Sequence, residues 1–253
     1  MAVILITGGT GRLGRKLVAC LRLIEGVVCI APDRSALDVL SPEGCAVAID
    51  RSCPDVVIHC AGFVNTFSAE SEHSRCWQLN VEGTRNVARA SRPARFVYVS
   101  TDYVFDGVQG NFAESDVPAP VNYYGLTKLV GEAIALEHPN SLVLRAPFRD
   151  DPPWAYPRAF ADQWTSCDFV SVRAPQVAAA ALGAHRGILH IGGERRSILA
   201  MARAVSPVVQ PMMRSEVAVR LPRDTSLDSS LWHSLIEASG RQSLRAETSI
   251  SAR

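Results

Sequence analysis

The sequence lacks the patterns that mark membrane and secreted proteins. No apolar run among its 253 residues approaches the roughly 18 residues that a bilayer-spanning helix needs. The N-terminus has neither a basic segment nor a cleavage pattern, and it runs directly into apolar residues and a glycine-rich turn. We therefore expect no signal peptide, no membrane association and a cytoplasmic protein.

Charge bias and metal-ligand clusters are also missing. The 26 Lys and Arg residues are scattered and nearly balance the 25 Asp and Glu residues, so the sequence predicts no binding to nucleic acid. The seven cysteines contain no Cys-x-x-Cys pair, and the six histidines form no metal-ligand pattern, so we expect no metal. An odd number of cysteines in mostly apolar surroundings predicts reduced, buried thiols.

The chain begins with an apolar segment that is followed by a glycine-rich turn. Residues 2–6 are rich in β-branched side chains and predict a strand that is buried on both faces. Gly8, Gly11 and Gly14 follow, and apolar residues then recur at helical spacing from Leu13. A strand that leads through such a turn into a helix presents backbone N–H groups to a pyrophosphate. The sequence therefore predicts a dinucleotide-binding turn.

An acidic and a basic residue follow the second predicted strand, at 27–31. Asp33 and Arg34 lie about twenty residues after the glycines, where an acid binds the adenosine ribose or an arginine binds the 2′-phosphate of NADP. Arg34 favours NADP(H), and Asp33 leaves NAD(H) as the alternative.

Small residues end the third predicted strand, at 55–59. Cys60, Ala61 and Gly62 would let a cofactor lie against the backbone at the carboxyl edge of the sheet. His59 is interpreted as a packed strand residue rather than a catalyst. Asn80, in a long helix predicted at roughly 70–91, either orders the backbone near the site or is merely structural.

The order of these elements predicts an α/β fold. Further strands are expected at 95–99 and 143–144, so five strands alternate with helices, and each connection is long enough for a right-handed crossover. We predict a doubly wound parallel Rossmann sheet as a dinucleotide-binding core at 1–148. The helix of residues 41 onward should start with Ser41 as its cap and Pro42 as its first residue.

The later part of the chain gives weaker patterns. We expect a small mixed substrate-binding region at 149–239, interleaved with the core. Its elements are short strands at 169–172 and 188–191 and helices at 174–184 and 229–239. The polar residues 240–253 lack apolar anchors and predict a flexible tail.

Three residues form a predicted proton-delivery set. Tyr124 and Lys128 are four positions apart, so they share one face of a helix. A neighbouring ammonium is expected to lower the pKa of the phenol, and Lys128 can also donate to the nicotinamide ribose. Thr101 ends the strand at 95–99 and can hydrogen-bond the same substrate oxygen. Tyr124 would then protonate a carbonyl oxygen as hydride reaches the carbon.

At these residues the sequence resembles the extended short-chain dehydrogenase/reductases, and among them most of all the dTDP-4-dehydrorhamnose reductase family. The resemblance covers about 1–148 and is most specific at 100–107 and 124–132. The other segments that carry it are 7–14, 54–61, 79–81 and 114–120, and residues 221–228 are similar to a late motif of the family's substrate-binding part.

The resemblance implies a reaction and a set of contacts. The reaction is reduction of the C4 ketone of a nucleotide-linked 4-keto-6-deoxy sugar. Gly11, Arg12 and Leu13 would contact the cofactor pyrophosphate, and Asp38 and Val39 would lie near the adenine. The remaining contacts that it implies are Ala61, Gly62, Phe63 and Val99 beside the cofactor, Phe63 also on the substrate side, and Thr101, Asp102 and Phe148 at the sugar.

Two alternatives stay open. The regulatory beta subunit of methionine adenosyltransferase resembles the same family and binds NADP and a partner enzyme without needing turnover, and the later half here looks short for the family. A nucleotide-sugar epimerase is the second alternative. A dehydratase is disfavoured, because Asp102 has no second acidic neighbour at Tyr103. A homodimer is compatible with the sequence, which does not fix the oligomeric state.

Overall fold

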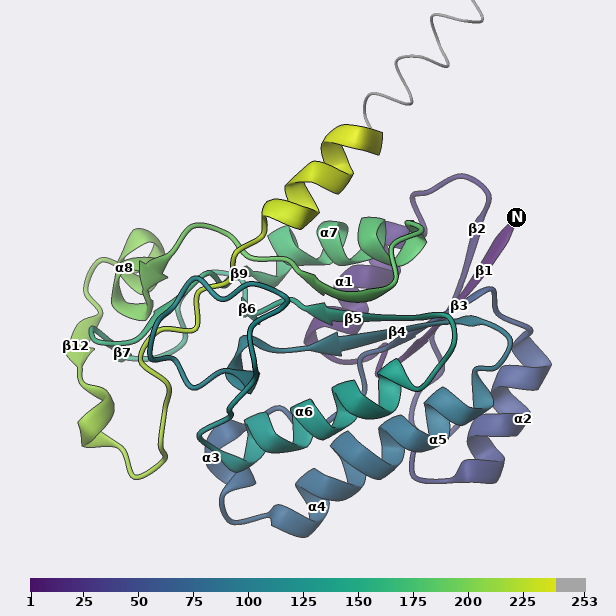
Figure 1. Cartoon of the computed structure of the whole chain (residues 1–253), viewed down its shortest axis with the longest axis horizontal. Helices are drawn as coiled ribbons and strands as arrows, with labels where there is room; N and C mark the ends of the chain where they lie inside the picture. The colour runs from purple at the N-terminus through teal and green to yellow at the C-terminus, as the bar shows by residue number, and fades with distance from the viewer. Residues whose placement is uncertain (240–253) are drawn as a thin grey trace, which may run out of the picture.

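Six parallel strands form the central sheet, in the order β10-β5-β4-β3-β1-β2 (Figure 1). The computed structural model describes residues 1–239, so the expected tail at 240–253 lies outside the described residues. The strands are β1 (Ala2–Thr7), β2 (Val27–Ile30), β3 (Val56–His59), β4 (Arg95–Ser100), β5 (Ser141–Arg145) and β10 (Gly187–His190). The predicted doubly wound parallel sheet is confirmed, and its strand order reverses between β1 and β3.

The structure differs from two expectations about the later chain. Residues 188–191 were expected among the mixed elements, but β10 pairs with β5 at the edge of the main sheet. The strand expected at 169–172 is also wrong, because β9 ends at Phe169 and helix α7 begins at Val170. The β-branched Val170 and Val172 favoured a strand by composition, yet Val170 packs as a buried helical residue in the core.

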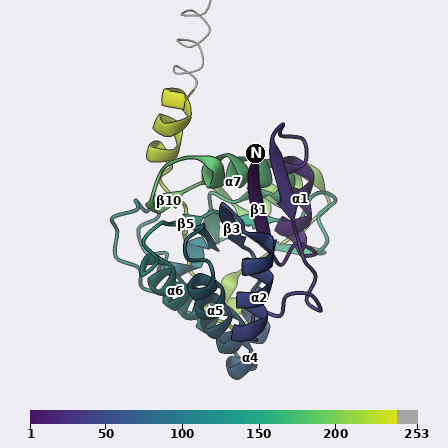
Figure 2. The ribbon, with the colours of Figure 1, turned by 90° about the vertical axis from the view of Figure 1, so that its right-hand side faces the viewer.

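Helices cover both faces of the sheet. Helices α1 and α7 lie on one face, and α2, α5 and α6 lie on the other, as the two perpendicular views show (Figures 1 and 2). The helices are α1 (Arg12–Leu21), α2 (Pro42–Ser52), α3 (Thr66–Ala69), α4 (His73–Trp77), α5 (Gly83–Ala90), α6 (Tyr123–Leu136), α7 (Val170–Leu182) and α8 (Ile198–Val205). A further helix spans 230–239.

The helix predicted at 70–91 is divided into segments. Helix α4 continues into a π-helical turn, Gln78–Glu82, and then into α5. A π turn holds one residue more than an α turn. Asn80 lies in this turn, is fully buried, and faces the sheet edge. Helix α2 begins as predicted, because the Gly44 N–H donates to Ser41 Oγ at 3.0 Å and Pro42 is the first helical residue.

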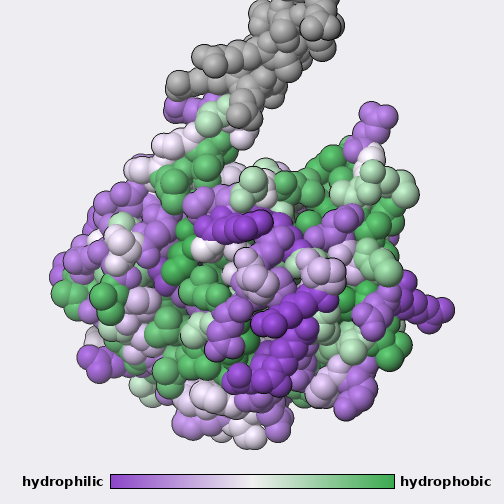
Figure 3. All heavy atoms as spheres, turned by 45° about the vertical axis from the view of Figure 1, so that its right-hand side comes forward, coloured by the Kyte–Doolittle hydropathy of each residue, from purple (hydrophilic) through white to green (hydrophobic). Residues whose placement is uncertain are grey.

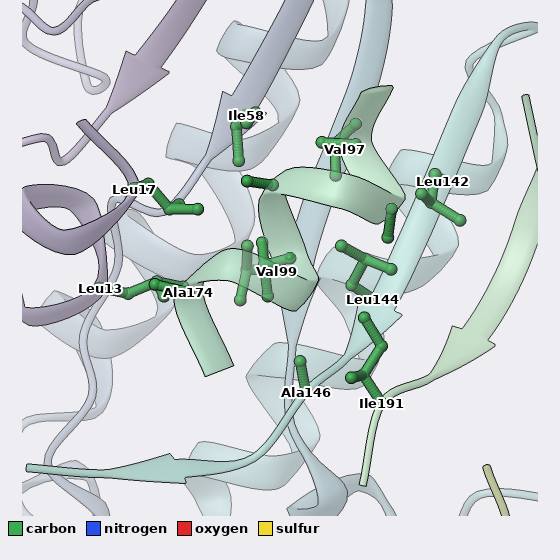
Figure 4. Close-up of a cluster of buried hydrophobic side chains, with 14 of the residues drawn as sticks. Leu13, Leu17, Ile58, Val97, Val99, Leu142, Leu144, Ala146, Ala174 and Ile191 are labelled. Atoms are coloured by element: carbon green, nitrogen blue, oxygen red, sulfur yellow. The ribbon is translucent and has the colours of Figure 1, made fainter. Parts of the chain in front are cut away.

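Apolar side chains between α1, α7 and the sheet form the larger core cluster. Figure 4 shows Leu13 and Leu17 of α1 and Ala174 of α7 lying against Val97 and Leu144 of the sheet. All five are buried, and burial of one leucine side chain contributes about 1.5–3 kcal/mol. This cluster holds the glycine-rich turn, which precedes α1, against the carboxyl edge of the strands.

The later chain adds short paired strands beside this edge (Figure 1, left). The pairs are β6 (Phe148–Arg149) with β9 (Asp168–Phe169), β7 (Arg158–Phe160) with β12 (Gln210–Met212), and β8 (Trp164–Thr165) with β11 (Arg196–Ser197). Figure 3 shows strongly hydrophilic side chains gathered in a band across the middle of one face of the molecule. In residues 1–239, no helix combines the length and apolar character that crossing a bilayer requires.

A buried ion pair ties α6 to β5. Arg145 Nη2 lies 2.7 Å from Glu132 Oε2, and the two side chains are only 1% and 2% exposed. Ser100 at the end of β4 donates its hydroxyl to Glu132, and Arg145 also contacts His190 of β10 at 3.1 Å. Removing one partner of such a pair costs about 3–5 kcal/mol, because a charge is left buried and unpaired.

The packing of α6 on the sheet leads to a testable prediction about Gly131. A Cβ there would lie 2.2 Å from the buried Tyr98 Oη. Helix propensity alone predicts that Gly131→Ala stabilises the protein by about 1 kcal/mol. We expect instead a loss of about 1–3 kcal/mol, because the Tyr98 ring is enclosed and cannot move aside. Urea unfolding measures this difference.

Gly183→Ala is the matched control. Its Cβ would meet atoms no closer than 3.4 Å, so its effect should stay within about 0.5 kcal/mol. If Gly131→Ala is as stable as the unchanged protein, α6 does not pack on Tyr98 as described.

Candidate functional site

The glycine-rich turn brings the backbone of three segments close together. Gly8 has a φ of +68°, and a Cβ there would lie 2.7 Å from the Ala61 backbone nitrogen. A Cβ at Gly14 would lie 2.2 Å from the Gly8 carbonyl oxygen. Both positions therefore require glycine. The close approach places the N-terminus of α1 against the ends of β1 and β3, where the strand order reverses and open α/β sheets bind ligands.

A cavity of about 450 Å³ opens at this point. Most of the residues expected to hold the cofactor line it, although they come from five separate parts of the chain. The expected residues on its wall are Gly8, Gly11, Arg12, Leu13, Gly14, Cys60, Ala61, Gly62, Phe63, Val99, Thr101, Tyr124, Lys128 and Phe148. The cavity thus joins the glycine-rich turn to the proton-delivery set.

Four residues expected near the adenine end lie outside this cavity, in the segment after β2. Arg34 is 74% exposed and reaches Asp38 at 3.5 Å. Asp33 accepts three hydrogen bonds from Ser35 and the Ala36 N–H within its own turn, and the Ser35 hydroxyl lowers the pKa of this carboxyl most. Val39 is a buried core residue.

Two buried polar residues lie in or behind the wall of the cavity, Asn80 on the wall itself and His59 at the end of β3. His59 Nδ1 lies 2.7 Å from Thr7 Oγ1, and burial lowers the pKa of His59 to about 3, so it is a neutral packed residue. Asn80 accepts from the Phe63 N–H at 2.7 Å and donates to the Phe63 carbonyl at 3.0 Å. Asn80 therefore orders the backbone beside the cavity.

Lys128 is buried with its ammonium aimed at β4. Asn122 caps α6 by accepting from the Gly125 N–H at 2.8 Å, which fixes the start of the helix before Tyr124. Lys128 Nζ donates to the Val99 carbonyl at 2.8 Å and lies 4.0 Å from the centre of the Tyr98 ring. Burial lowers the pKa of Lys128 to about 8, and the nearby Glu132 carboxylate opposes this shift.

The phenol of Tyr124 differs from the expectation. Lys128 was expected to lower the pKa of Tyr124, but burial of the phenol raises that pKa above its ordinary value, while a hydrogen bond with Thr101 works in the opposite direction. The expectation was wrong because the Lys128 ammonium is directed to the Val99 carbonyl and the Tyr98 ring. A raised pKa keeps the phenol protonated at neutral pH, which suits a proton donor.

A second cavity, of about 170 Å³, adjoins the first. The residues on the walls of both include Arg12, Thr101, Tyr124 and Phe148. Asp102 lines the second cavity and is 4% exposed. Burial raises the pKa of its carboxyl, and hydroxyl donors from three threonines oppose that shift. Thr101 and Tyr124 therefore stand at the junction of the two cavities.

The later chain contributes residues that sequence reasoning missed. Arg149, Trp154 and Thr165 line the second cavity, together with Thr225. Arg149 lies over the Trp154 ring at 5.8 Å. Thr225 falls in the segment 221–228, whose likeness to a family motif was the one available indication. Arg149 and Thr165 lie in two-residue strands, which leave no periodic pattern in the sequence.

The cysteines and acidic groups give no metal site in the described part of the chain. Within residues 1–239, no three His, Cys, Asp or Glu side chains are arranged to hold an ion. All seven cysteines are free. The expectation that the thiols are buried holds for Cys45, Cys76 and Cys167. It is wrong for Cys53, which is exposed at the end of α2, and Cys20, Cys29 and Cys60 are only partly buried.

Comparison with known proteins agrees with this geometry. The family model described as the RmlD substrate binding domain matches residues 1–149. The chain is 41% identical over 137 residues to the dTDP-4-keto-6-deoxy-D-glucose reductase of Streptomyces niveus, a match that covers 53% of this chain and 47% of that protein. It is 36% identical over 158 residues to the methionine adenosyltransferase 2 subunit beta of Rattus norvegicus, covering 57% of this chain and 46% of that protein.

The sequence matches thus span about half the length of these two relatives, whereas the structural likeness extends further. The crystal structure of the dTDP-4-dehydrorhamnose reductase of Bacillus anthracis in complex with NADP superposes with a TM-score of 0.82 at 24% identity. The match covers 92% of this chain and 91% of that chain, so the later half shares the fold as well. Because the family model matches more than half of the residues, the chain belongs to the RmlD substrate binding domain family.

Proposed function

We propose that the protein is an NADP(H)-preferring reductase that transfers hydride to the C4 ketone of a nucleotide-linked 4-keto-6-deoxy sugar, with Tyr124 as the proton donor. One observation carries the proposal: Thr101 and Tyr124 stand where the cavity beside the glycine-rich turn meets the second cavity. A carbonyl carbon at this junction would face a nicotinamide on one side and the phenol on the other. The relatives named as reductases of dTDP-linked keto sugars support this substrate class.

The residues at the junction divide the chemistry between them. A bound NADPH supplies the hydride. As the carbonyl π bond breaks, its electron pair moves to oxygen, and Tyr124 donates its phenolic proton to that oxygen. Lys128, whose pKa is lowered by burial to about 8, would hold the nicotinamide ribose by donating a hydrogen bond to it. Thr101, which lines both cavities beside Tyr124, would hydrogen-bond the same substrate oxygen and fix its position.

The segment after β2 supports a preference for NADP(H). Asp33 Oδ1 already accepts hydrogen bonds from three donors of its own turn, so this oxygen is less able to accept one from a ribose hydroxyl. Arg34 is exposed and free to turn from Asp38 toward a 2′-phosphate. The NADP bound to the Bacillus anthracis protein supports the same preference. NAD(H) is the alternative cofactor.

A third cavity argues for a substrate longer than a sugar. It measures about 580 Å³ and shares Arg12, Arg149 and Trp154 with the second cavity. Its wall also carries the aromatic residues Phe67 and Tyr156. Arginines beside aromatic rings suit a diphosphate and a base, so the nucleotide part would occupy this space.

The likeness to the methionine adenosyltransferase 2 subunit beta supports a second candidate function. A regulatory subunit would bind NADP and a partner enzyme without turnover. Assays of NAD(P)H oxidation with a panel of dTDP- and UDP-4-keto-6-deoxy sugars separate the two. Cofactor binding without oxidation for every sugar, together with a stoichiometric enzyme partner, would refute the reductase. Net inversion of the sugar without oxidation of added NADPH would instead indicate the epimerase.

Replacing the proton donor tests the mechanism. Tyr124→Phe should lower kcat by about 100-fold or more, since a positioned acid contributes roughly 10²–10⁴-fold. The dissociation constant of NADPH should change by less than about threefold, because the aromatic ring that lines the cavity remains. Steady-state kinetics and fluorescence titration measure the two quantities.

Tyr123→Phe is the matched control. Tyr123 is the adjacent residue of α6, and its ring stacks on His73 at 4.0 Å, away from both cavities. Its kcat should equal that of the unchanged protein. Turnover that survives in Tyr124→Phe would remove Tyr124 from the role of donor.

The cofactor preference has its own test. Arg34→Ala should raise the KM for NADPH about tenfold, equivalent to about 1.4 kcal/mol of lost phosphate binding, and should leave the KM for NADH nearly unchanged. Arg51→Ala, an exposed arginine near the end of α2, is the control and should alter neither value. Equal effects of Arg34→Ala on both cofactors would contradict a contact with the 2′-phosphate.

A further inference from the structure

Arg12 begins α1 at the glycine-rich turn, and its side chain extends away from that turn. Within residues 1–239, it is the one charged side chain on the walls of all three cavities. Arg12 Nη1 lies 3.0 Å from Oδ2 of Asp150, which follows β6 and is 138 residues away in the sequence. Asp150 lines the second cavity and not the first. The guanidinium group is therefore directed toward the substrate side of the site.

The Asp150 carboxylate occupies a place that also suits a phosphate. A guanidinium group binds carboxylate and phosphate oxygens through the same planar set of N–H donors. The residue after Asp150 anchors this segment on two sides. Asp151 accepts from the Ser171 N–H at 2.8 Å, at the start of α7, and pairs with Lys16 of α1 at 2.6 Å. Asp150 is therefore held beside Arg12 by contacts that do not involve Arg12.

The pair of Arg12 and Asp150 is weak enough for a ligand to separate it. The two side chains are 48% and 50% exposed, so both can turn without disturbing the core. Water and salt screen such a pair, and it contributes little to stability. A diphosphate carries more than one negative charge, whereas Asp150 carries one. A diphosphate in the second cavity would therefore replace Asp150 at the Arg12 guanidinium.

A second arginine lines the same space. Arg149 directly precedes Asp150 and shares the walls of the second and third cavities with Arg12. Its guanidinium lies over the Trp154 ring, 5.8 Å from the ring centre, and this contact limits where it can move. Two guanidinium groups on the walls of the same two cavities can together bind the two phosphates of one diphosphate.

We propose that the Arg12 side chain binds the diphosphate of the nucleotide sugar and that Asp150 competes with the substrate for it. Arg12, expected at the cofactor pyrophosphate, would meet that group through its backbone N–H alone. Asp150 would thereby lower the affinity of the site for a nucleotide. The inference rests on the proposed reductase function, because it takes the ligand of the second and third cavities to be a nucleotide sugar.

Binding of dTDP to protein saturated with NADP⁺ tests the competition without turnover, since the cofactor then fills the first cavity. Arg12→Gln should raise the Kd of dTDP about tenfold, because a charge-assisted contact with a phosphate is lost. Asp150→Asn should lower this Kd about threefold, because the competing charge is removed. The Kd of NADPH should change by less than about threefold in Arg12→Gln. Isothermal titration calorimetry measures all three quantities.

Each variant has a matched control. Arg15→Gln removes the same charge from α1, at an exposed residue that lines none of the three cavities. Asp151→Asn removes the neighbouring carboxylate, which pairs with Lys16 instead. Both controls should keep the Kd of dTDP within about twofold of the unchanged protein. The proposal is overturned if the unchanged protein does not bind dTDP, or if Arg12→Gln weakens NADPH binding and leaves dTDP binding intact.

A double-mutant cycle separates competition from simple repulsion. In an Arg12→Gln background, Asp150→Asn should leave the Kd of dTDP within about 1.5-fold, since the guanidinium group for which Asp150 competes is gone. An equal gain in both backgrounds would mean that Asp150 repels the nucleotide directly, and the competition would be wrong. If the cycle shows coupling while no keto sugar is reduced by the unchanged protein, the diphosphate site stands and the reductase proposal fails.

Discussion

The buried contact between Glu132 and Arg145 is the constraint on which the site geometry depends. Glu132 lies one helical turn after Lys128 on α6, so the ion pair sets the rotation of the helix that carries the proton-delivery residues. The same carboxylate takes the hydroxyl of Ser100, directly before Thr101. One buried charge pair thus aligns α6 with the ends of β4 and β5. A shift of either element would separate the phenol from the hydroxyl that it faces.

Much of the fold follows from local sequence, because the Rossmann core repeats one unit. Continuous apolar runs mark strands that are buried on both faces, and capping residues such as Ser41 mark helix starts. The later half could not be predicted to the same depth. Its strands outside the main sheet are two or three residues long, too short for a period. Strand β10 joins the main sheet through pairing that local sequence does not encode. The domain boundary at 148 stays a prediction.

The candidate site also has a part that could be predicted from the sequence and a part that could not. Residues in the glycine-rich turn and at strand ends could be found, because their chemistry is tied to position along a repeated unit. The direction of the Tyr124 pKa could not, since it depends on the enclosure of the phenol and on where the Lys128 ammonium points. Arg149 and Thr165 become visible only once folding brings distant segments together. The roles of all the site residues, the cytoplasmic location and the homodimer stay predictions.

The π-helical turn at Gln78–Glu82 shifts the angular phase of the helix that contains it. One extra residue advances the following side chains by about 100° relative to an unbroken α-helix. Asn80 can therefore face the cofactor wall and Val87 the core, while Trp77, counted among the apolar positions of one straight helix, is 37% exposed with its indole nitrogen 3.3 Å from Glu82. The π turn thus lets one continuous helix present one side chain to the cofactor wall and another to the core. Deleting a single residue from the turn would restore α-helical phase and move Asn80 away from Phe63.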